Sequence, residues 1–228
     1  MSRVTIHDDA DAAVACVSDG STILIGGFGM AGMPVTLIDA LIRQGATDLT
    51  VVSNNAGNGD TGLAALLAAG RVRTMVCSFP RQKDSWVFDG LYRDQKIELE
   101  VVPQGNLAER MRAAGAGIGA FFCPTGVGTP LAEGKETREI EGRTYVLEYP
   151  IHGDVALIGA YRADRMGNLV YRKTARNFGP VMATAASTTI AEVAEVVDTG
   201  TLDPESVVTP SIYVDHVLDL SAAKEAVA

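Results

Sequence analysis

Residues 21–34 read STILIGGFGMAGMP, a short β-rich run that leads into glycines at positions 26, 27, 29 and 32. Gly27, Gly29 and Gly32 match the G-x-G-x-x-G spacing of a dinucleotide-binding turn. So many glycines in one turn lose much conformational entropy when the turn becomes ordered. This entropic cost is typical of a loop whose backbone N–H groups approach a ligand closely, as at anion or carbonyl sites.

The loop meets the other demands of a dinucleotide site poorly. Pro34 follows the third glycine by two residues, where a helix begun within the glycines would need a backbone N–H. The acid expected about 20 residues further on, at the end of the next strand, is missing, because that strand ends in Ser53, Asn54 and Asn55. We therefore expect no NAD. The alternatives are a tight structural turn and a site for another ligand.

Around this loop, apolar runs alternate with helical patterns up to about residue 105. Strands are expected at 21–26, 48–53, 73–78 and 97–102, and helices at 8–20, 34–45, 61–70 and 84–95. Pro34 opens the helix 34–45, where proline needs no N–H partner. Short strands separated by helices predict βαβ units and a parallel sheet.

The pattern changes after residue 105. A helix at 106–115 precedes a Gly/Pro-rich stretch, 115–130, that is typical of a long loop. Further strands are expected at 144–150, 154–164, 168–173, 188–197 and 211–218, with a hairpin turn at 164–169 and a helix at 178–186. One α/β domain over residues 1–228 fits this pattern better than two domains, for which 105–120 would be the boundary.

Composition excludes several classes of function. The chain has 228 residues, 47% of them hydrophobic, and its net charge of −9 argues against general attraction to nucleic acid or anionic membranes. Its three scattered cysteines lack C-x-x-C spacing and are typical of a reduced, cytoplasmic protein. The three histidines show no metal-ligand spacing. We expect no metal, no secretory signal and no membrane span.

Amide side chains stand where predicted strands end. Asn54 and Asn55 follow the strand 48–53, and Gln104 follows the strand 97–102. Open α/β sheets place ligands at the carboxyl ends of their strands. A neutral amide there donates hydrogen bonds without forming an ion pair. The structural alternatives are an Asx turn for the asparagines and a surface position for the glutamine.

Two nearby cations could bind an anionic substrate. Arg81 and Lys83 lie in FPRQKDS, and either could pair with a carboxylate. The alternative is a solvated basic pair. Cys77 and Cys123 are expected to be small buried apolar residues and not nucleophiles.

The stretch DGSTILIGGFGMAGMP, residues 19–34, resembles the signature of the A (alpha) subunit of family I CoA-transferases. There an acid and a glycine precede three apolar residues, G-G-F and a later G-x-P. The likeness continues through VVSNNAGNG, VPQGNLAERMRAAGAGIGAFFCPTGVGT, LAEGKETREI and YRKTARNFGP. Residues 76–110, and Gly179 after RNF, are most similar to members that act on 3-oxoadipate, whereas acetoacetate-using members generally have asparagine after RNF.

The resemblance implies an open, mostly parallel α/β sheet with helices on both faces, as in family I CoA-transferases and NagB/RpiA-like proteins. It implies that CoA passes from succinyl-CoA to 3-oxoadipate through acyl-enzyme anhydride and enzyme–CoA thioester intermediates. No cofactor would be permanently bound, since CoA and acyl-CoA are substrates. The expected partner is a beta subunit, commonly in an alpha2-beta2 assembly.

The family's nucleophilic glutamate lies in the beta subunit, within a Ser-Glu-Asn-Gly-like motif that this sequence lacks. We therefore expect no catalytic nucleophile in this chain and no turnover without the partner. By resemblance, the CoA-binding loop consists of Gly26, Gly27, Phe28, Gly29, Met30, Ala31 and Gly32. The resemblance also implies that the substrate is contacted by Asn54, Asn55, Gln104, Arg81 and Lys83. The loop could bind a CoA oxygen or polarise the thioester carbonyl. Lys173 and Arg176 would serve the partner interface or the substrate.

Three other functions stay open at this point. A sugar-phosphate isomerase or deaminase of related fold would need its own acid and base in the chain. An acyl-CoA-binding or regulatory subunit would hold its ligand without chemistry. A CoA-transferase subunit could instead act on acetoacetate or a short fatty acid.

Overall fold

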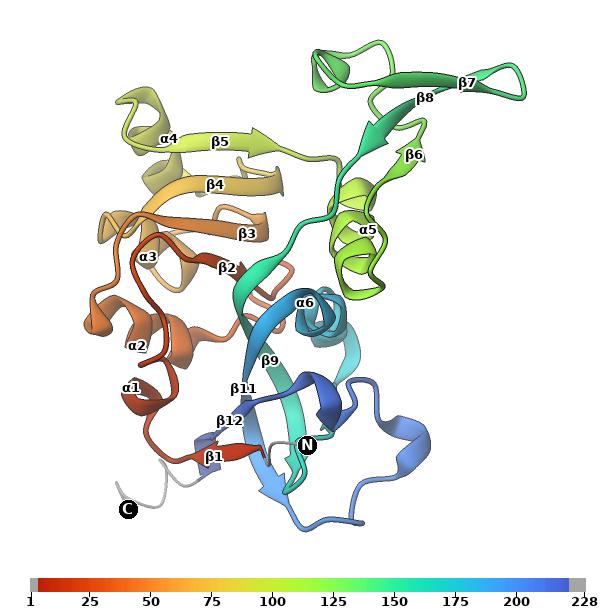
Figure 1. The fold of residues 1–228 in the computed structure, drawn as a ribbon. Coiled ribbons are helices and arrows are strands. Elements are labelled where there is room, and N and C mark those ends of the chain that lie inside the picture. The colour runs from red at the N-terminus through yellow and green to blue at the C-terminus, as the bar shows by residue number, and fades with distance from the viewer. Residues whose placement is uncertain (1–3, 222–228) are drawn as a thin grey trace.

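A computed structural model describes residues 4–221 of the chain, and its largest feature is a sheet of nine strands (Figure 1). The strands are β1 (Thr5–His7), β2 (Thr22–Ile25), β3 (Leu49–Asn55), β4 (Val72–Phe79), β5 (Glu98–Val101), β9 (Gly153–Asp164), β10 (Leu169–Val170), β11 (Ala186–Val197) and β12 (His216–Asp219). Their order is β1-β12-β11-β9-β2-β3-β4-β5, with β10 beside β9. Every pair is parallel except β9–β10. The predicted parallel sheet is confirmed.

The strand order reverses at β2, which lies between β3 and β9. Ile23 of β2 aligns with Val51 of β3 on one side and with Val155 of β9 on the other. From β2 the chain builds outward through β3, β4 and β5, and the later strands extend the sheet in the opposite direction. Open α/β sheets leave a crevice at such a reversal, beyond the carboxyl ends of the strands. The loop after β2 lies there.

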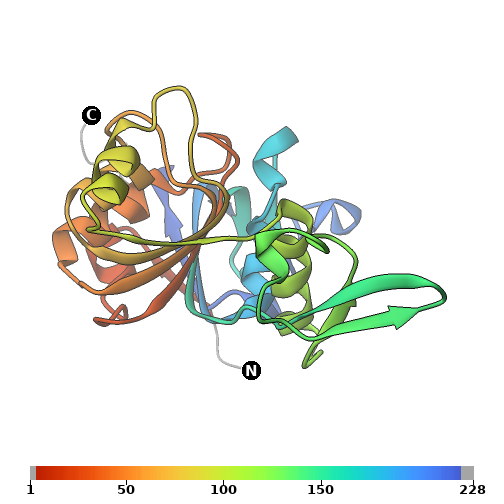
Figure 2. The same ribbon diagram turned by 90° about the horizontal axis from the view of Figure 1, so that it is seen from above.

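Helices cover both faces of the sheet (Figure 2), as expected. One face carries α1 (Ala10–Ala13), α2 (Val35–Gln44), α3 (Leu63–Ala68) and α4 (Trp86–Arg93), and the other carries α5 (Gln104–Gly115) and α6 (Gly179–Ala185). Leu37 and Leu41 recur on one face of α2 and are fully buried. Leu107 and Met111 do the same on α5. Burial of these stripes fixes each helix against its face.

A second, antiparallel sheet extends away from the first (Figures 1 and 2). It consists of β6 (Phe121–Cys123), β8 (Arg143–Glu148) and β7 (Thr137–Ile140), in the order β6-β8-β7. We call residues 121–148 the arm. The Pro/Gly-rich stretch 115–130, predicted as a loop, therefore contains strand β6, a correction that antiparallel pairing with β8 explains, and it ends where the 3-10 helix Pro130–Ala132 begins.

The expected helix at 8–20 is confined to Ala10–Ala13. Tertiary contacts end it early, because Asp19 accepts a hydrogen bond from the Thr47 N–H at 2.7 Å and the Gly20 N–H donates to Thr47 O at 3.0 Å. The chain must straighten to make these bonds and enter β2. Helical periodicity persists only as burial of Ala13, Val14 and Val17.

Two expected strands are shorter than predicted. The segment 168–173 is extended only at Leu169–Val170 and then forms the 3-10 helix Lys173–Arg176. The segment 211–218 begins with the 3-10 helix Ser211–Tyr213, because the Tyr213 N–H donates to Pro210 O at 3.1 Å in a turn. A further 3-10 helix spans Pro204–Ser206. None of the helices within residues 4–221 has the length and apolar character to cross a bilayer.

Candidate functional site

Residues 26–32, the glycine loop, form a tight turn between β2 and α2. The Phe28 N–H donates to Ala31 O at 3.0 Å, and the Ala31 N–H donates back to Phe28 O at 3.3 Å. Gly29 and Met30 therefore form the tip. Gly29 has φ +59° and Gly32 has φ +72°, in the left-handed region that favours glycine.

The helix after this loop begins at Val35, directly behind Pro34. Proline at this boundary lacks the N–H that a helix cannot satisfy internally. The glycines thus belong to a turn ahead of the helix and not to its first turn, as the position of Pro34 predicts.

The turn leaves a small set of backbone donors free. The Gly26 N–H donates to Leu157 O at 2.9 Å, and the Gly27 N–H donates to Asn177 Oδ1 at 3.2 Å. With Phe28 and Ala31 bonded to each other, the N–H groups of Gly29 and Met30 donate to no group within residues 4–221. The Gly32 N–H also donates to no described group, but Gly32 packs against Ala175, so Gly29 and Met30 are the donors that the exposed tip can offer to a ligand.

A cavity of about 820 Å³ opens beside the loop tip, at the carboxyl ends of β3 and β4. Its lining consists of Phe28, Gly29, Asn54, Ser78, Phe79, Arg81, Gln82, Lys83 and Gln104. Six of these are among the predicted site residues: Phe28, Gly29, Asn54, Arg81, Lys83 and Gln104. The fold thus brings together four segments that the sequence separates: 28–29, 54, 78–83 and 104.

Three polar side chains form a network at the back of this cavity. Ser78 Oγ donates to Asn54 Oδ1 at 2.7 Å, and Gln104 Nε2 donates to the same oxygen at 3.0 Å. Asn54 itself is only 4% exposed. Because its oxygen accepts both bonds, its Nδ2 is the group left to donate, and no acceptor for it exists within the described chain. The network orients a buried amide donor beside the cavity.

The remaining predicted site residues lie outside the lining. Asn55 is 1% exposed, and its Oδ1 accepts from the Gly57 N–H at 2.8 Å, which is the Asx turn considered above. Gly26, Gly27, Met30, Ala31 and Gly32 shape the loop but do not line the cavity.

The two cations at the cavity differ in their partners. Arg81 forms a bidentate ion pair with Asp89, with bonds of 2.7 and 3.1 Å, and this hydrogen-bonded pair lowers the pKa of the Asp89 carboxyl. Lys83 is exposed and forms no ion pair with any residue between 4 and 221. Lys83 is therefore the cation that can bind an anion without losing an existing partner.

Ser78, Phe79 and Gln82 line the cavity although sequence reasoning did not select them. Ser78 and Phe79 end β4, and Asn55 at the end of β3 aligns with Phe79. The rule that selected Asn54 and Gln104, a polar side chain at a strand's carboxyl end, would also have found Ser78. No comparable signal marks Gln82.

Glu192 is a buried carboxyl group on the other side of the glycine loop. It lines a cavity of about 250 Å³ together with Gly32 and Met33. Its Oε2 accepts from the Leu37 N–H at 3.0 Å, in the first turn of α2. Burial raises its pKa to about 7, against the lowering effect of hydrogen bonds from the start of α2. Glu192 thus anchors the helix that follows the loop.

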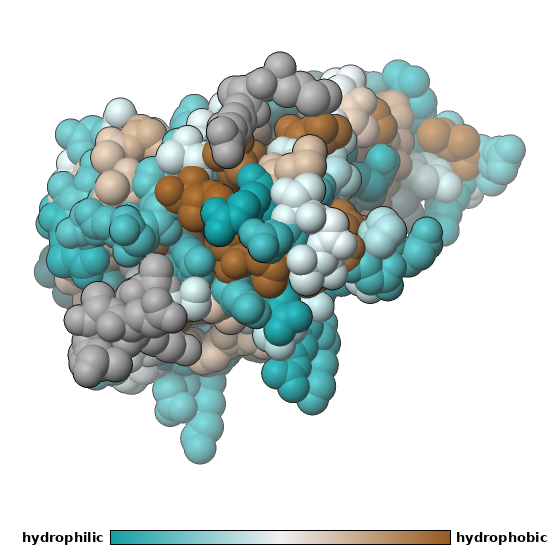
Figure 3. Space-filling model, turned by 90° about the horizontal axis from the view of Figure 1, so that it is seen from below, coloured by the Kyte–Doolittle hydropathy of each residue, from teal (hydrophilic) through white to brown (hydrophobic). Residues whose placement is uncertain are grey.

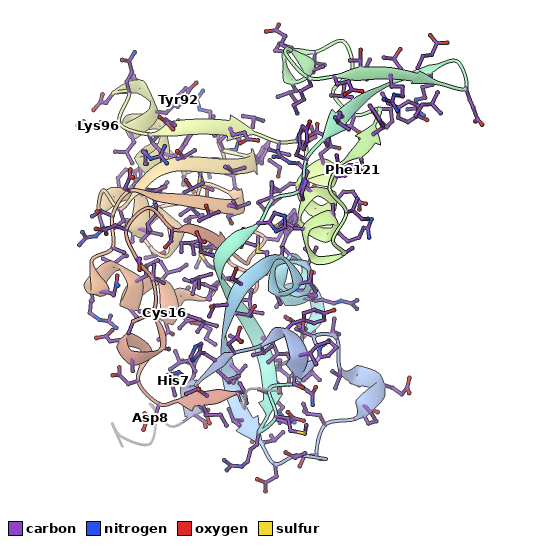
Figure 4. All side chains as sticks on the ribbon, viewed as in Figure 1. His7, Asp8, Cys16, Tyr92, Lys96 and Phe121 are labelled. Carbon is purple, nitrogen blue, oxygen red and sulfur yellow. The ribbon has the colours of Figure 1, made fainter. Side chains whose placement is uncertain are left out.

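Other reactive side chains lie away from the main cavity. Cys16 and His7, both labelled in Figure 4, lie by α1 and β1, and His7 Nε2 is 3.0 Å from His216 Nδ1. Cys77 is buried, as predicted, and burial raises its pKa to about 12, which leaves it protonated. Cys123 is half-buried and donates to Asn106 Oδ1. Within residues 4–221, no cluster of three or more His, Cys, Asp or Glu is placed to hold a metal ion.

A further cavity of about 460 Å³ lies beside β1, lined by Val4, Thr5, Ile6 and Arg165. Figure 3 shows the molecule from this lower side, where hydrophobic side chains gather near the centre and hydrophilic ones interrupt them. The cavity offers one cation and no convergent donors. The cavity beside the glycine loop is therefore the candidate site.

A family model described as coenzyme A transferase matches residues 7–220. This chain therefore belongs to the coenzyme A transferase family. The A subunit of the 3-oxoadipate CoA-transferase of Pseudomonas putida is 67% identical over 217 residues, which cover 95% of this chain and 94% of that protein. The A subunit of a probable succinyl-CoA:3-ketoacid coenzyme A transferase of Bacillus subtilis is 51% identical over 213 residues, covering 93% and 88%.

The fold also matches solved structures. The apoenzyme of an acyl-CoA transferase from Escherichia coli O157:H7 superposes with a TM-score of 0.83 at 26% identity, over 95% of this chain. This chain spans 47%, about half, of that chain. The likeness confirms the predicted α/β class.

Proposed function

We propose that this chain is the alpha subunit of a CoA-transferase that moves CoA from succinyl-CoA to 3-oxoadipate, and that a beta subunit supplies the reacting carboxylate. The observation that carries the proposal is the lining of the main cavity. Amides, a serine and two cations lie there, and within the described residues the lining includes no carboxylate. The relative from Pseudomonas putida, named for 3-oxoadipate, exceeds the 3-ketoacid relative from Bacillus subtilis in identity, 67% against 51%.

The reaction divides one difficult exchange into substitutions at carbonyl carbon. The partner's glutamate oxygen bonds to the thioester carbon of succinyl-CoA, the C–S bond breaks, and CoA leaves as thiolate. The thiolate then bonds to the glutamyl carbon of the resulting anhydride, and succinate leaves. The carboxylate of 3-oxoadipate repeats both steps in reverse, which yields 3-oxoadipyl-CoA and restores the glutamate.

Each substitution places negative charge on a carbonyl oxygen, and this chain offers donors for that charge. The free N–H groups of Gly29 and Met30 and the Nδ2 of Asn54 are already oriented before the substrate arrives. Fixed donors stabilise a developing oxyanion without reorganising during the reaction. We assign the loop Gly26–Gly32 to the thioester end of the acyl-CoA on this basis, with Gln104 holding Asn54 in place.

The second carboxylate of 3-oxoadipate distinguishes it from acetoacetate, and we assign it to Lys83. Lys83 and Arg81 both line the cavity, but Arg81 already binds Asp89. A charge-assisted bond from Lys83 to the distal carboxylate would favour the dicarboxylic substrate.

Exposed apolar side chains near the site support a partner surface. Phe28 and Phe79, both in the cavity lining, are 54% and 58% exposed, and Trp86 at the start of α4 is 61% exposed. Large exposed aromatic side chains beside an opening, as Phe28 and Phe79 are here, are typical of an interface. We place the beta subunit over this opening, in an alpha2-beta2 assembly, with residues 1–228 acting as one domain. The three free thiols fit a reducing, cytoplasmic setting.

The test is CoA transfer from succinyl-CoA, measured with the purified chain alone and with a co-purified beta subunit. The proposal expects activity only with the partner and a higher kcat/KM for 3-oxoadipate than for acetoacetate. Turnover by this chain alone would overturn the half-site proposal. A preference for acetoacetate would overturn the substrate assignment and favour the 3-ketoacid reaction named for the relative from Bacillus subtilis.

A further inference from the structure

One side chain from a distant part of the sequence bonds to both ends of the glycine loop. Asn177 follows the 3-10 helix Lys173–Arg176. Its Nδ2 donates to Ala31 O at 2.9 Å, and its Oδ1 accepts from the Gly27 N–H at 3.2 Å. A single amide thus joins Gly27 and Ala31, which lie on either side of Phe28 and the exposed tip.

The same amide is fixed on its own segment. Its Nδ2 also donates to Thr174 O at 2.8 Å, and its Oδ1 also accepts from the Phe178 N–H at 2.7 Å. These four bonds use both N–H groups and both lone-pair sites of the side chain. Because two of them hold the amide in place, the other two can hold the loop.

Close backbone packing supports the loop from both sides. A Cβ built on Gly32 would lie 2.4 Å from Ala175 O, so the segment that carries Asn177 lies directly against the loop. A Cβ built on Gly159 of β9 would lie 2.8 Å from Gly32 O. The loop is therefore enclosed between β9 and residues 173–177, and its tip remains exposed.

We infer that Asn177 is a positioning residue that keeps the Gly29 and Met30 N–H groups unpaired and fixed beside the cavity. Asn177 does not line the cavity, so it acts through the loop and not on the ligand. Because Asn177 occupies the Gly27 N–H, the free donors of the loop are those of Gly29 and Met30 at the tip and that of Gly32, which packs against Ala175. The inference rests on the proposed function, in which those N–H donors stabilise the oxyanion that develops during CoA transfer.

The test uses the alpha–beta complex with the substitutions Asn177→Ala and Asn177→Asp. Alanine removes all four bonds, whereas aspartate keeps the acceptor for the Gly27 N–H and loses the donor to Ala31 O. We expect kcat to fall about 10- to 100-fold in both variants, with KM for the acceptor acid changed by less than about threefold. Deuterium uptake in a peptide covering residues 26–34 should rise, while assembly with the partner is retained.

Asn168→Ser is the matched control. Asn168 also bonds through its side chain on both sides, donating to Asp164 Oδ2 at 2.8 Å and accepting from the Ser211 N–H at 3.0 Å. It lies in the β9–β10 turn and lines no part of the main cavity. Its kcat should stay within about twofold of the unsubstituted complex.

The outcomes separate the inference from the proposed function. If the unsubstituted complex transfers no CoA, the proposed function fails, and the uptake of residues 26–34 alone decides the role of Asn177. If the complex is active and both Asn177 variants keep kcat within about twofold, the inference is overturned. It is equally overturned if Asn177→Ala leaves that uptake unchanged.

Gly32→Ala and Gly70→Ala keep the question answerable if the Asn177 variants fail to fold. Gly32 has φ +72° and Gly70 has φ +68°, so both substitutions incur the same left-handed strain. A methyl group at Gly70 meets no atom within 4 Å, whereas at Gly32 it meets Ala175 O. We expect at least a roughly tenfold lower kcat for Gly32→Ala and an unchanged kcat for Gly70→Ala. Equal kcat values would overturn the inference.

Discussion

The glycine loop and the arm are attached to the rest of the protein by opposite means. Neutral hydrogen bonds and close backbone packing hold the loop, with Asn177 at its centre. The arm is attached through a charged group. The carboxylate of Glu148, 3% exposed, lies 3.9 Å from Arg110 of α5 and accepts from Asn106 Nδ2 of α5 at 3.2 Å, and within the arm it accepts from Lys135 Nζ at 2.8 Å.

The difference follows from what each region contacts. A charged anchor beside the loop would add a fixed field where thioester and carboxylate charges change during transfer. The neutral amide of Asn177 orients the loop without adding such a field. The arm lines no part of the main cavity, so a buried ion pair can fix its direction despite the cost of desolvation.

The largest effect is expected at the cavity, from Asn54→Ala. Loss of an oriented donor to a developing oxyanion lowers kcat about 100- to 1,000-fold. Steady-state kinetics of the alpha–beta complex measures it. Asn55→Ala is the matched control, because Asn55 lies outside the cavity and caps the Gly57 N–H, so it should cost about 1 kcal/mol of stability and little kcat. Equal losses of kcat would contradict the assignment of Asn54.

A substitution that weakens the attachment of the arm should lower the free energy of unfolding and leave kcat unchanged. Glu148→Gln removes the carboxylate shared by the half-buried Arg110 and the exposed Lys135, and because solvent screens the Lys135 pair, we expect the free energy of unfolding to fall by about 1 to 3 kcal/mol. Urea unfolding of the isolated chain measures the loss. Glu139→Gln on the exposed strand β7 should change it by less than about 0.5 kcal/mol. A similar small change for Glu148→Gln would show that charge does not hold the arm.

The start of α2 should be sensitive to pH through Glu192. Its pKa is raised to about 7 in the folded chain from the ordinary value of 4.5, so the folded state binds the proton more tightly. The resulting stability is present below about pH 4.5 and is lost as pH rises through about 7. We expect the difference in unfolding free energy between the natural chain and Glu192→Gln to change by roughly 1 to 3 kcal/mol over this window. A flat difference would contradict the burial argument.

The smallest effect is expected for Lys83→Met. Loss of one charge-assisted bond at an exposed position should raise KM for 3-oxoadipate about tenfold and leave acetoacetate unaffected. Arg81→Met should do less, since Arg81 already binds Asp89. Lys96→Met, in the turn between α4 and β5 (Figure 4), is the neutral control. An equal rise of KM for both acids would place the distal carboxylate elsewhere.

Much of the fold could be predicted because its signals are local. Apolar runs and helical periodicity mark β2, β3, β9, α2 and α5, and glycine and proline mark the turn before α2. Strand β7 could not be predicted, because all its residues are exposed and charge interrupts any alternation. The early end of α1 was also beyond local reasoning, since it depends on bonds to Thr47.

The candidate site, too, could be predicted only in part from the sequence. The strand-end rule selected Asn54 and Gln104, and the structure places both in the cavity, whereas Asn55 caps a turn instead. Asn54 and Asn55 are consecutive residues, and successive side chains on a strand point to opposite faces. Which face bears the cavity depends on how α5 and the glycine loop are placed.

The sequence by itself determined the parallel α/β class, the family and the absence of a family-like nucleophilic motif, because periodicity and local motifs encode these directly. Only the tertiary structure decided that Asn177 reaches both ends of a loop 150 residues earlier, that Arg81 is already paired, and that Glu192 anchors α2. Such contacts arise from strand order and packing, which bring distant residues together and leave no local periodicity in the chain.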